Sequence, residues 1–411
     1  MKVAAVITTF FFRSHAHVIL ENFLNPYYFN GKRTEPGVDV VAFYVDQFHE
    51  QDMARDVAEK YGIPIYPTIA AALCRGGSEL AVDAVLAIGE HGDYPVSEKG
   101  QREYPRKRFF DEIVAVFEKS GRVAPVFNDK HLSYRFDWAR EMYETARRME
   151  VPLMAGSSVP LAQRRPPLEL SPGAKVVEAV SVHGGPVESY DFHGLEVLES
   201  MVEARHGGEA GIASVQFLEG DALWNAAEQG LWSPELAHAA LEAELGPRAE
   251  PLPELIASLQ PTTGRRRRQS RGPHGILLEH RDGLRSLMLA VGRSSTRWDF
   301  ACRVEGEPQP QATSFYTGPW QNRCLFKALS HAIQTHFRQR QAPYPVERTL
   351  LTTGTLDAAM TSRQKDGQRI ETPELAIAYQ AKDYRAMREM GESWKIITED
   401  TPEPQGFGTL A

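Results

Sequence analysis

Ionisable side chains gather where short apolar runs of the chain end. Glu90-His91-Gly92-Asp93 follows one such run and Asn128-Asp129-Lys130-His131 follows another, while His193 and Glu196 stand three residues apart in a helical pattern. Residues that follow parallel strands meet at one edge of their sheet. Imidazole, carboxylate and ammonium groups together suit a polar substrate and proton transfer to or from it. Two alternatives stay open, a divalent metal held by His91, Asp93 and His193, or structural hydrogen bonds.

The start of the chain predicts the element that positions these groups. Lys2–Thr9 has the apolar character of a strand, His15–Leu24 the pattern of a helix, and Val38–Asp46 that of a second strand ending on an acid. Strand, helix, strand and acid form the βαβ opening of a doubly wound nucleotide-binding domain. Val82–Gly89 continues this rhythm as a nearly all-apolar run, typical of a buried parallel strand. We therefore predict an α/β fold with a Rossmann-like parallel sheet in residues 1–156.

The turn after the first strand departs from the nucleotide-binding pattern. A GxGxxG turn is expected there, but the chain reads Thr8-Thr9-Phe10-Phe11-Phe12-Arg13. Glycines let the backbone approach a pyrophosphate closely, and bulky side chains block part of that approach. The three phenylalanines are expected to pack beneath the sheet edge, with one ring covering the cofactor cleft as the alternative. The pattern thus indicates the fold more strongly than the cofactor.

Beyond residue 156 the pattern changes to strands in succession with helices at both ends. Arg164–Pro167 reads as a linker, and four strand candidates lie between Gly275 and Tyr316. We predict an α+β second domain, residues 157–382, with an open, mostly antiparallel sheet and a last helix near 347–362. Residues 247–271, including the arginine run 265–268, are expected to form a loose loop, and residues 383–411 a polar C-terminal tail.

Composition and charge exclude several classes of protein. The 411 residues are 42% apolar and 24% charged with a net charge of −8, as in a globular protein and unlike a general nucleic-acid binder. No apolar run reaches the roughly 18 residues of a membrane span, so we predict no membrane partner. The chain begins without secretory features, and Cys74, Cys302 and Cys324 form no CxxC pair. These features predict a cytoplasmic protein without a disulfide framework.

The layout resembles the Gfo/Idh/MocA family, the glucose–fructose oxidoreductase and inositol dehydrogenase type. Asp46 closes the second strand as in that family, and Lys130 stands in the place of the lysine of its Glu-Lys-Pro motif. His193 with Glu196 is similar to the family's His-x-x-Asp, at the start of a helix in the second domain. Residues 327–362 are similar to its C-terminal end. Each motif is altered and the glycine turn is replaced, which implies a divergent branch.

The resemblance implies an NAD(P)-dependent oxidoreductase that acts on a polyhydroxylated small molecule such as a sugar, a cyclitol or a sugar acid. Hydride transfer of this kind needs a base for the hydroxyl proton. The resemblance makes His193 the acid–base residue and has Lys130 either donate a hydrogen bond to the substrate oxygen or position the nicotinamide. Glu196, three residues after His193, would lie on the same helix face and orient substrate hydroxyls. Asp46 would accept a hydrogen bond from the ribose and favours NAD over NADP. The family's second-domain sheet commonly mediates dimers or tetramers, so a homo-oligomer is implied.

Two rival functions stay open beside the redox enzyme. One is a non-redox enzyme on the same scaffold, using acid–base or metal-assisted chemistry, and the other is a non-catalytic ligand-binding relative. The altered turn favours both rivals, while the density of titratable groups at strand ends argues against the second. The residues assigned to the cofactor are Thr8, Thr9, Phe10, Phe12, Arg13, Asp46, Glu90 and His91, and those assigned to the substrate are Asp93, Asp129, His131, Asp191 and Asp221.

Overall fold

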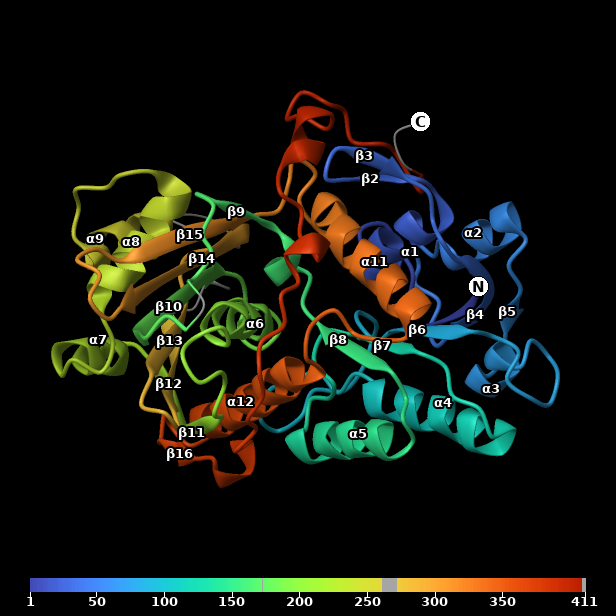
Figure 1. The fold of residues 1–411 in the computed structure, drawn as a ribbon, viewed down its shortest axis with the longest axis horizontal. Helices are drawn as coiled ribbons and strands as arrows, with labels where there is room; N and C mark the ends of the chain where they lie inside the picture. The colour runs from blue at the N-terminus through green and yellow to red at the C-terminus, as the bar shows by residue number, and fades with distance from the viewer. Residues whose placement is uncertain (172, 261–271, 409–411) are drawn as a thin grey trace.

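The first domain is built on six parallel strands. A computed structural model describes residues 1–171, 173–260 and 272–408 of the protein (Figure 1). The strand order is β5-β4-β1-β6-β7-β8 and every neighbouring pair is parallel, so the predicted Rossmann-like sheet is confirmed. The strands are β5 (Ile65–Tyr66), β4 (Asp39–Val45), β1 (Lys2–Ile7), β6 (Ala84–Ile88), β7 (Val126–Asp129) and β8 (Leu153–Gly156).

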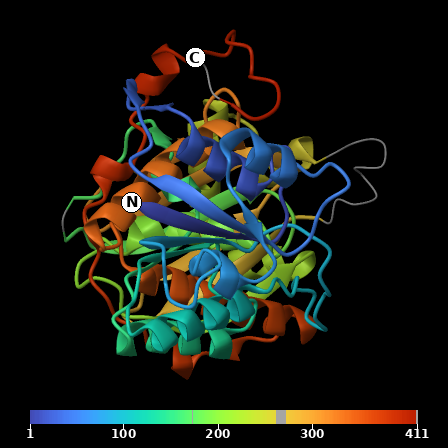
Figure 2. The ribbon, with the colours of Figure 1, turned by 90° about the vertical axis from the view of Figure 1, so that its right-hand side faces the viewer.

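Helices cover both faces of this sheet. α4 and α5 lie on one face and α1 on the other (Figures 1 and 2). The helix predicted over residues 15–24 is confirmed with the same bounds, because the Ser14 hydroxyl caps it by accepting from the His17 backbone N–H. The helices are α1 (His15–Leu24), α2 (Ala54–Tyr61), α3 (Ile69–Leu73), α4 (Arg106–Ser120) and α5 (Phe136–Arg148).

The second domain holds an eight-stranded, mostly antiparallel sheet, as predicted. Among its neighbouring pairs in the described residues, only β10 and β13 run parallel. The sheet order is β16 (Ile370–Glu371), β11 (Ile212–Glu219), β12 (His274–His280), β13 (Arg285–Ala290), β10 (Val176–Gly184), β14 (Ser294–Val304), β15 (Gln311–Tyr316) and β9 (Gln163–Arg165). The helices that follow the first domain are α6 (Asp191–Val202), α7 (Asp221–Glu228), α8 (Pro234–Leu245), α9 (Leu252–Leu259), α11 (Asn322–Gln339) and α12 (Val346–Gln364).

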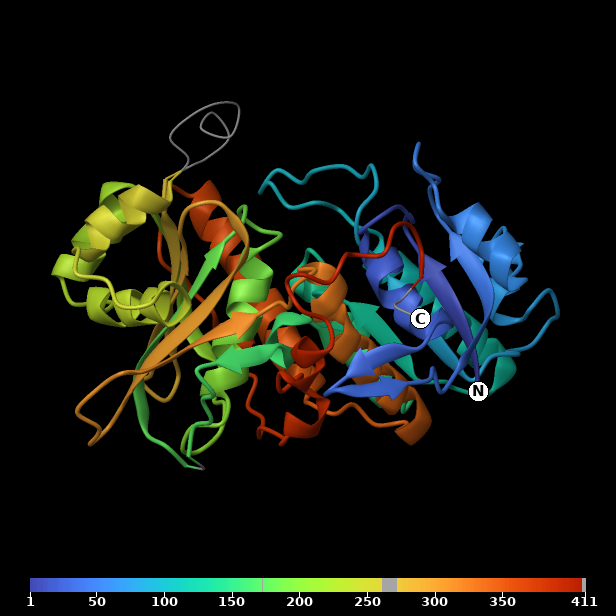
Figure 3. The ribbon, with the colours of Figure 1, turned by 90° about the horizontal axis from the view of Figure 1, so that it is seen from above.

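Both faces of the second sheet are buried. Along β10, Ala179 belongs to the core shared with α6, whereas Val180 and Val182 belong to a second core with α8 and α9. Figure 3 shows α8 and α9 on the outer side of the sheet. The homo-oligomer implied by the family resemblance stays a prediction, and a partner approaching this side would meet helices instead of bare strands.

After the second sheet the chain returns to the first domain. α11 packs along α1, where Arg323 donates to both carboxylate oxygens of Glu21, Nε to Oε2 at 2.9 Å and Nη2 to Oε1 at 2.9 Å. The same Nη2 donates to the carbonyl oxygens of Gly406 and Gly408 at 3.1 and 2.8 Å. Gly406 and Gly408 of the polar tail are therefore held against the first domain by a buried guanidinium.

Two segments differ from the sequence prediction, and a third, for which the sequence predicted no element, contains a hairpin. Leu252–Leu259, within the predicted loose loop, is the helix α9, because its leucines bury one face against the second sheet. The predicted linker contributes an edge strand, since β9 pairs with β15. Residues 25–37 contain a hairpin of β2 (Tyr27–Phe29) and β3 (Lys32–Thr34). The arginine run 265–268 lies outside the described residues. None of the described helices combines the length and apolar content of a membrane span.

Glu21→Gln is expected to lower the free energy of unfolding by about 3 kcal/mol, because it leaves the buried Arg323 guanidinium without its main carboxylate. The double variant Glu21→Met/Arg323→Met is expected to recover most of that loss, since both charges disappear together. Urea unfolding measures both effects. Glu392→Gln, which breaks the exposed pair with Lys395, is the matched control and should cost less than about 1 kcal/mol. Equal losses for the buried and exposed variants would contradict the role given to Arg323.

Candidate active site

Lys130 lies at the centre of the candidate site, where the two domains meet. It follows β7 in a left-handed conformation with φ of 64°, and the Asn128 amide closes the turn by donating to the His131 carbonyl oxygen at 3.1 Å. This conformation is uncommon for a residue with a Cβ and recurs at functional sites. The buried ammonium donates to Glu90 Oε1 at 2.8 Å and to the carbonyl oxygen of Ser189 at 3.4 Å. Lys130 therefore joins a strand end of the first domain to the loop before α6.

Glu90 balances the charge of Lys130 and shares a second cation. Arg106, at the start of α4, donates to Glu90 Oε2 at 2.5 Å, and its other terminal nitrogen lies 2.9 Å from His131 Nε2. Burial by itself would raise the pKa of Glu90, but Lys130 and Arg106 outweigh it and hold that pKa well below its ordinary value. Burial and Arg106 together hold the pKa of His131 well below its ordinary value. The centre thus contains an ionised carboxylate beside a neutral imidazole.

Glu188 is a carboxyl group of this site that the sequence analysis did not single out. It lies in the loop between β10 and α6, with a left-handed φ of 71° and a buried side chain. Its Oε1 has no hydrogen-bond partner, and His131 Nε2 lies 3.8 Å from it. Burial raises the pKa of Glu188 to about 7, against the pull of Lys130 and with help from the Glu90 charge. Glu188 can therefore exchange a proton near neutral pH, as an acid–base residue must.

His193 begins α6 and faces the same centre from the second domain. Its Nδ1 lies 2.6 Å from the Ser157 hydroxyl, just after β8. The ring packs against Tyr190 and Trp298, with centroid distances of 6.1 and 5.5 Å. Burial, followed by the charge of Lys130, holds the pKa of His193 well below its ordinary value. The imidazole is therefore neutral at pH 7, and a neutral ring has one nitrogen that can accept a hydrogen bond.

His15 on α1 and His91 after β6 lie against each other at this edge of the sheet. His15 Nδ1 lies 2.6 Å from Asp129 Oδ2, and its ring meets that of His91 at a centroid distance of 5.2 Å. Burial, and then the nearby His15, lower the pKa of His91 to about 4. His91 Nδ1 is buried without a hydrogen-bond partner. Asp129 and His91, which were assigned to substrate and cofactor, thus lie in one cluster beside Lys130.

Three predicted residues lie outside this cluster. Glu196 Oε1 accepts hydrogen bonds from the hydroxyls of Thr349 and Thr352 at 3.0 and 2.8 Å, so it ties α6 to α12. Asp221 begins α7, exposed at the far end of the second domain (Figure 1). Asp93 is exposed on the loop after β6. The structure does not bring these three carboxylates to Lys130.

The turn after β1 does not offer the cradle that a dinucleotide pyrophosphate requires. Thr8 is buried and its hydroxyl donates to the Glu90 carbonyl oxygen at 2.5 Å. The Phe11 ring lies against the rings of His49 and His91, with centroids 4.4 and 5.3 Å away. A bound pyrophosphate approaches the backbone closely between the first strand and helix, and these rings fill that approach. The residues present do not fit a dinucleotide held in the usual way.

The other residues assigned to the cofactor have structural partners. Thr9 and Phe10 are buried, and Phe10 packs against an aromatic ring of the C-terminal tail. Phe12 is exposed. Arg13 forms an ion pair with Glu403 of the tail. None of these four side chains points a free hydrogen-bond donor at the start of α1. The turn therefore makes packing contacts and does not offer side-chain donors to a phosphate.

Asp46 stands at the end of β4 as predicted, but both of its oxygens already have partners. Oδ1 accepts from the Tyr44 hydroxyl at 2.6 Å and from Arg108 at 2.5 Å, while Oδ2 accepts from the Tyr94 hydroxyl at 2.7 Å. Burial alone would raise the pKa of Asp46, and the hydrogen bonds from these three groups lower it instead. A ribose hydroxyl at this position would have to displace one of them.

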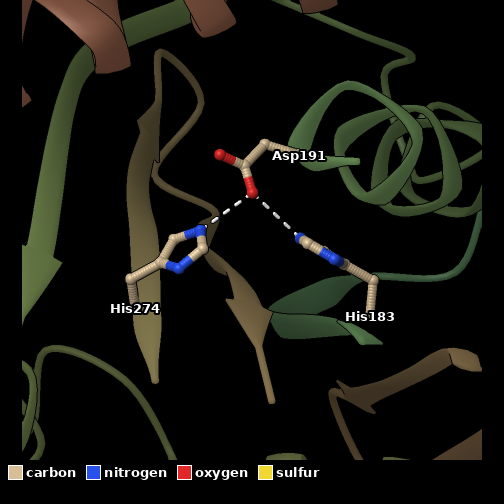
Figure 4. Close-up of side chains that lie close together, drawn as sticks. All are labelled: His183, Asp191 and His274. Atoms are coloured by element: carbon tan, nitrogen blue, oxygen red, sulfur yellow. Dashed lines mark hydrogen bonds and ion pairs between the residues drawn. The ribbon is translucent and has the colours of Figure 1, made fainter. Parts of the chain in front are cut away.

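A carboxylate between two imidazoles lies on the second-domain side of the loop before α6 (Figure 4). Asp191 Oδ1 lies 2.8 Å from His274 Nε2 and 3.0 Å from His183 Nε2. Two imidazoles and a carboxylate are a frequent ligand set for a metal. However, the backbone N–H of Gly185 donates to His183 Nδ1 at 3.1 Å, so the proton of neutral His183 is on Nε2 and points at Asp191. The group is therefore a hydrogen-bonded carboxylate, because a ligating nitrogen must be free of its proton.

The metal set considered from the sequence is not brought together. Residues 1–171, 173–260 and 272–408 contain two groups in which three potential ligand side chains lie close together. His91, Asp93 and His193 form neither of these groups. The first is the group of Figure 4. The second is a buried pair of carboxylates with a histidine, in which an arginine already forms an ion pair with one carboxylate.

Glu188→Gln is expected to change how stability depends on pH. The folded protein keeps the Glu188 proton up to about pH 7, whereas a carboxyl of ordinary pKa 4.5 releases it earlier when the chain unfolds. Stability from this group is therefore lost as the pH rises from about 4.5 to 7, by roughly 1–3 kcal/mol. The amide does not titrate, so the free energy of unfolding, measured with urea near pH 5 and pH 8, should fall less between these pH values in the variant than in wild type. Glu228→Gln, on an exposed side chain, is the control; parallel profiles for wild type and Glu188→Gln would contradict the raised pKa.

Solved structures with this fold include inositol dehydrogenases. The myo-inositol dehydrogenase from Lactobacillus casei in complex with NAD(H) and myo-inositol matches with a TM-score of 0.55 and 15% identity, over 90% of this chain and 96% of that one. GenD2 from gentamicin A biosynthesis, in complex with NAD, matches with a TM-score of 0.54 and 14% identity, over 90% and 95% of the two chains. Neither a family model nor a curated protein matches the sequence. The chain therefore has the fold of the Gfo/Idh/MocA-type inositol and sugar dehydrogenases that it was predicted to resemble.

Proposed function

We propose that the protein is an enzyme that acts on a polyhydroxylated small molecule, a sugar, a cyclitol or a sugar acid, by proton transfer at Lys130, Glu188 and His193. The observation that carries this proposal is a buried carboxyl group with a pKa of about 7 next to a buried, carboxylate-paired lysine. The substrate class is supported by the fold, because a dehydrogenase with the same fold was solved with myo-inositol. A cytoplasmic location remains a prediction from the sequence.

Each of the three side chains has its own task in this proposal. The Lys130 ammonium donates a hydrogen bond to a substrate oxygen and stabilises negative charge as it develops there. Glu188 takes the proton of a substrate hydroxyl or returns it, because its pKa lies close to neutral pH. The neutral imidazole of His193 forms a hydrogen bond with a substrate hydroxyl from the opposite domain and orients it for proton transfer. Glu90 stays ionised between Lys130 and Arg106, so it positions the lysine and does not serve as the base.

The proposed function has two forms, which differ in whether the enzyme uses a nicotinamide cofactor. An NAD(P)-dependent oxidoreductase, with NAD favoured by Asp46, is supported by the NAD complexes of proteins with the same fold. A non-redox acid–base enzyme is supported by the residues themselves, because Phe11 fills the pyrophosphate approach and Asp46 is already bonded on both oxygens. The geometry favours the non-redox form. A non-catalytic relative is disfavoured, because the buried Glu188 oxygen without a hydrogen-bond partner lowers the stability of the protein. A protein that only binds a ligand would have no need of that carboxyl group.

Lys130→Met is expected to lower kcat by about 100-fold or more while the protein stays folded, because Arg106 still neutralises Glu90. Sugars, cyclitols and sugar acids incubated with the protein, with and without NAD(P), would be screened for conversion by proton NMR. The variant would then be assayed on the substrate that is found. Lys395→Met, on an exposed side chain, is the control and should retain full turnover. Near-normal turnover by Lys130→Met, with an unchanged melting curve, would contradict the assigned centre.

Titration with NAD and NADH is expected to show no saturable binding in the micromolar range, because binding must displace the Phe11 ring and a partner of Asp46. Calorimetry measures the titration, and analysis of the supernatant after denaturation detects dinucleotide carried through purification. One dinucleotide per chain in either measurement would favour the redox form over the non-redox form. The Lys130 assignment would survive that outcome, since both forms use the same proton-transfer centre.

A further inference from the structure

A cavity of about 490 Å³ opens beside the loop 184–187, separate from the side chains assigned to proton transfer. Its walls include this loop, His274 at the start of β12, Arg363 near the end of α12, and Gly100 from the first domain. Its size falls within the range of small-molecule sites. Both domains contribute to the lining, as is common for ligand sites. The chemistry of the lining therefore indicates which ligand the cavity suits.

Arg363 brings a positive charge to this cavity without an acidic partner. Within the described residues its guanidinium forms no ion pair and donates no hydrogen bond, and its Nε is buried. The guanidinium lies over the Phe217 ring, 5.5 Å from the centroid, which holds it in place without neutralising it. The chain as a whole carries a net charge of −8, so acidic groups are plentiful elsewhere. A planar cation left open in a cavity suits a carboxylate or a phosphate.

His274 adds a hydrogen-bond acceptor to the lining of the same cavity. Its Nε2 donates to Asp191 Oδ1 at 2.8 Å, so in the neutral ring Nδ1 is left as an acceptor. Asp191 is itself fixed, because its Oδ2 accepts from the Glu188 backbone N–H at 2.8 Å. The His274 ring stacks on Phe217 with centroids 5.0 Å apart, on the same ring that supports Arg363. One aromatic ring thus supports both the cation and the acceptor in the lining of this cavity.

We propose that this cavity is a binding site for a small polyhydroxylated anion. Arg363 binds the carboxylate or phosphate group, and His274 Nδ1 accepts a hydrogen bond from a hydroxyl of the same molecule. Arg293 also lines the cavity and adds a second guanidinium to its wall. A metal is not the ligand, because the proton on His183 Nε2 occupies the space between the two imidazoles and Asp191. The proposal is independent of the chemistry at Lys130, since it uses none of those side chains.

Isothermal titration of the full chain with D-gluconate, D-glucose 6-phosphate and the neutral polyol D-glucitol tests the site. We expect at least one of the two anions to bind ten times more tightly than glucitol, and the stronger of the two identifies the anionic group. Arg363→Gln should remove this preference, whereas Arg363→Lys should keep most of it. His274→Asn should weaken the anion at least threefold, and affinity should fall as salt rises. Arg369→Gln, which removes an exposed arginine paired with Glu279 and Glu371, is the matched control.

Three results would overturn the site. Equal affinities for glucitol and both anions would show that the cavity does not select charge. Anion binding that survives Arg363→Gln would place the anion elsewhere on the molecule. No binding of any of the three probes at millimolar concentration would show that the cavity holds no such ligand. Melting curves of the variants separate a lost contact from lost folding, and Arg363→Lys gives a second measure should Arg363→Gln unfold.

Discussion

A lysine ammonium buried between two domains is tolerated only where a carboxylate lies against it. Lys130 and Glu90 meet this requirement at 2.8 Å, with Arg106 on the other carboxylate oxygen. These contacts fix the relative positions of the ends of β6 and β7, the start of α4 and the loop that supplies the Ser189 carbonyl oxygen. The two cations exceed the one carboxylate by a single charge, and burial, together with that excess, holds the pKa values of His131 and His193 well below their ordinary value.

The loop between β10 and α6 connects this charged centre with the cavity on its other side. Glu188 offers its side chain to the centre, while its backbone N–H donates to Asp191. Asp191 in turn accepts from His183 and His274, so one carboxylate orders two imidazoles on β10 and β12, the strands on either side of β13. A shift of this loop would therefore move the acid–base carboxyl and the cavity wall together. The left-handed backbone at Glu188 and at Lys130 shows that the contacts between domains over-determine the local conformation.

The fold is that of inositol and sugar dehydrogenases, yet the surface that would meet a dinucleotide is filled by the chain itself. The Phe11 ring packs at a tilt against the His49 ring, and the loop after β6 brings Tyr94 to Asp46. A fold supplies a scaffold, and the chemistry depends on the side chains placed at its strand ends. Here those strand ends carry titratable side chains without a phosphate cradle. This combination explains why the geometry favours acid–base chemistry over hydride transfer.

The sequence by itself determined the elements, because apolar periodicity, caps and turn residues act within a few neighbours along the chain. The helix 15–24, the parallel sheet and the second, mostly antiparallel sheet follow from such local patterns, and Lys130 and His193 stand at the strand and helix ends expected from them. Only the tertiary structure decided that Glu188 belongs to the site, since a glutamate in a loop has no local mark of burial. It also decided the partners of Asp46 and the helix α9, whose apolar face exists only against the second sheet. Burial and electrostatics arise from residues far apart in the chain, and no local pattern records them.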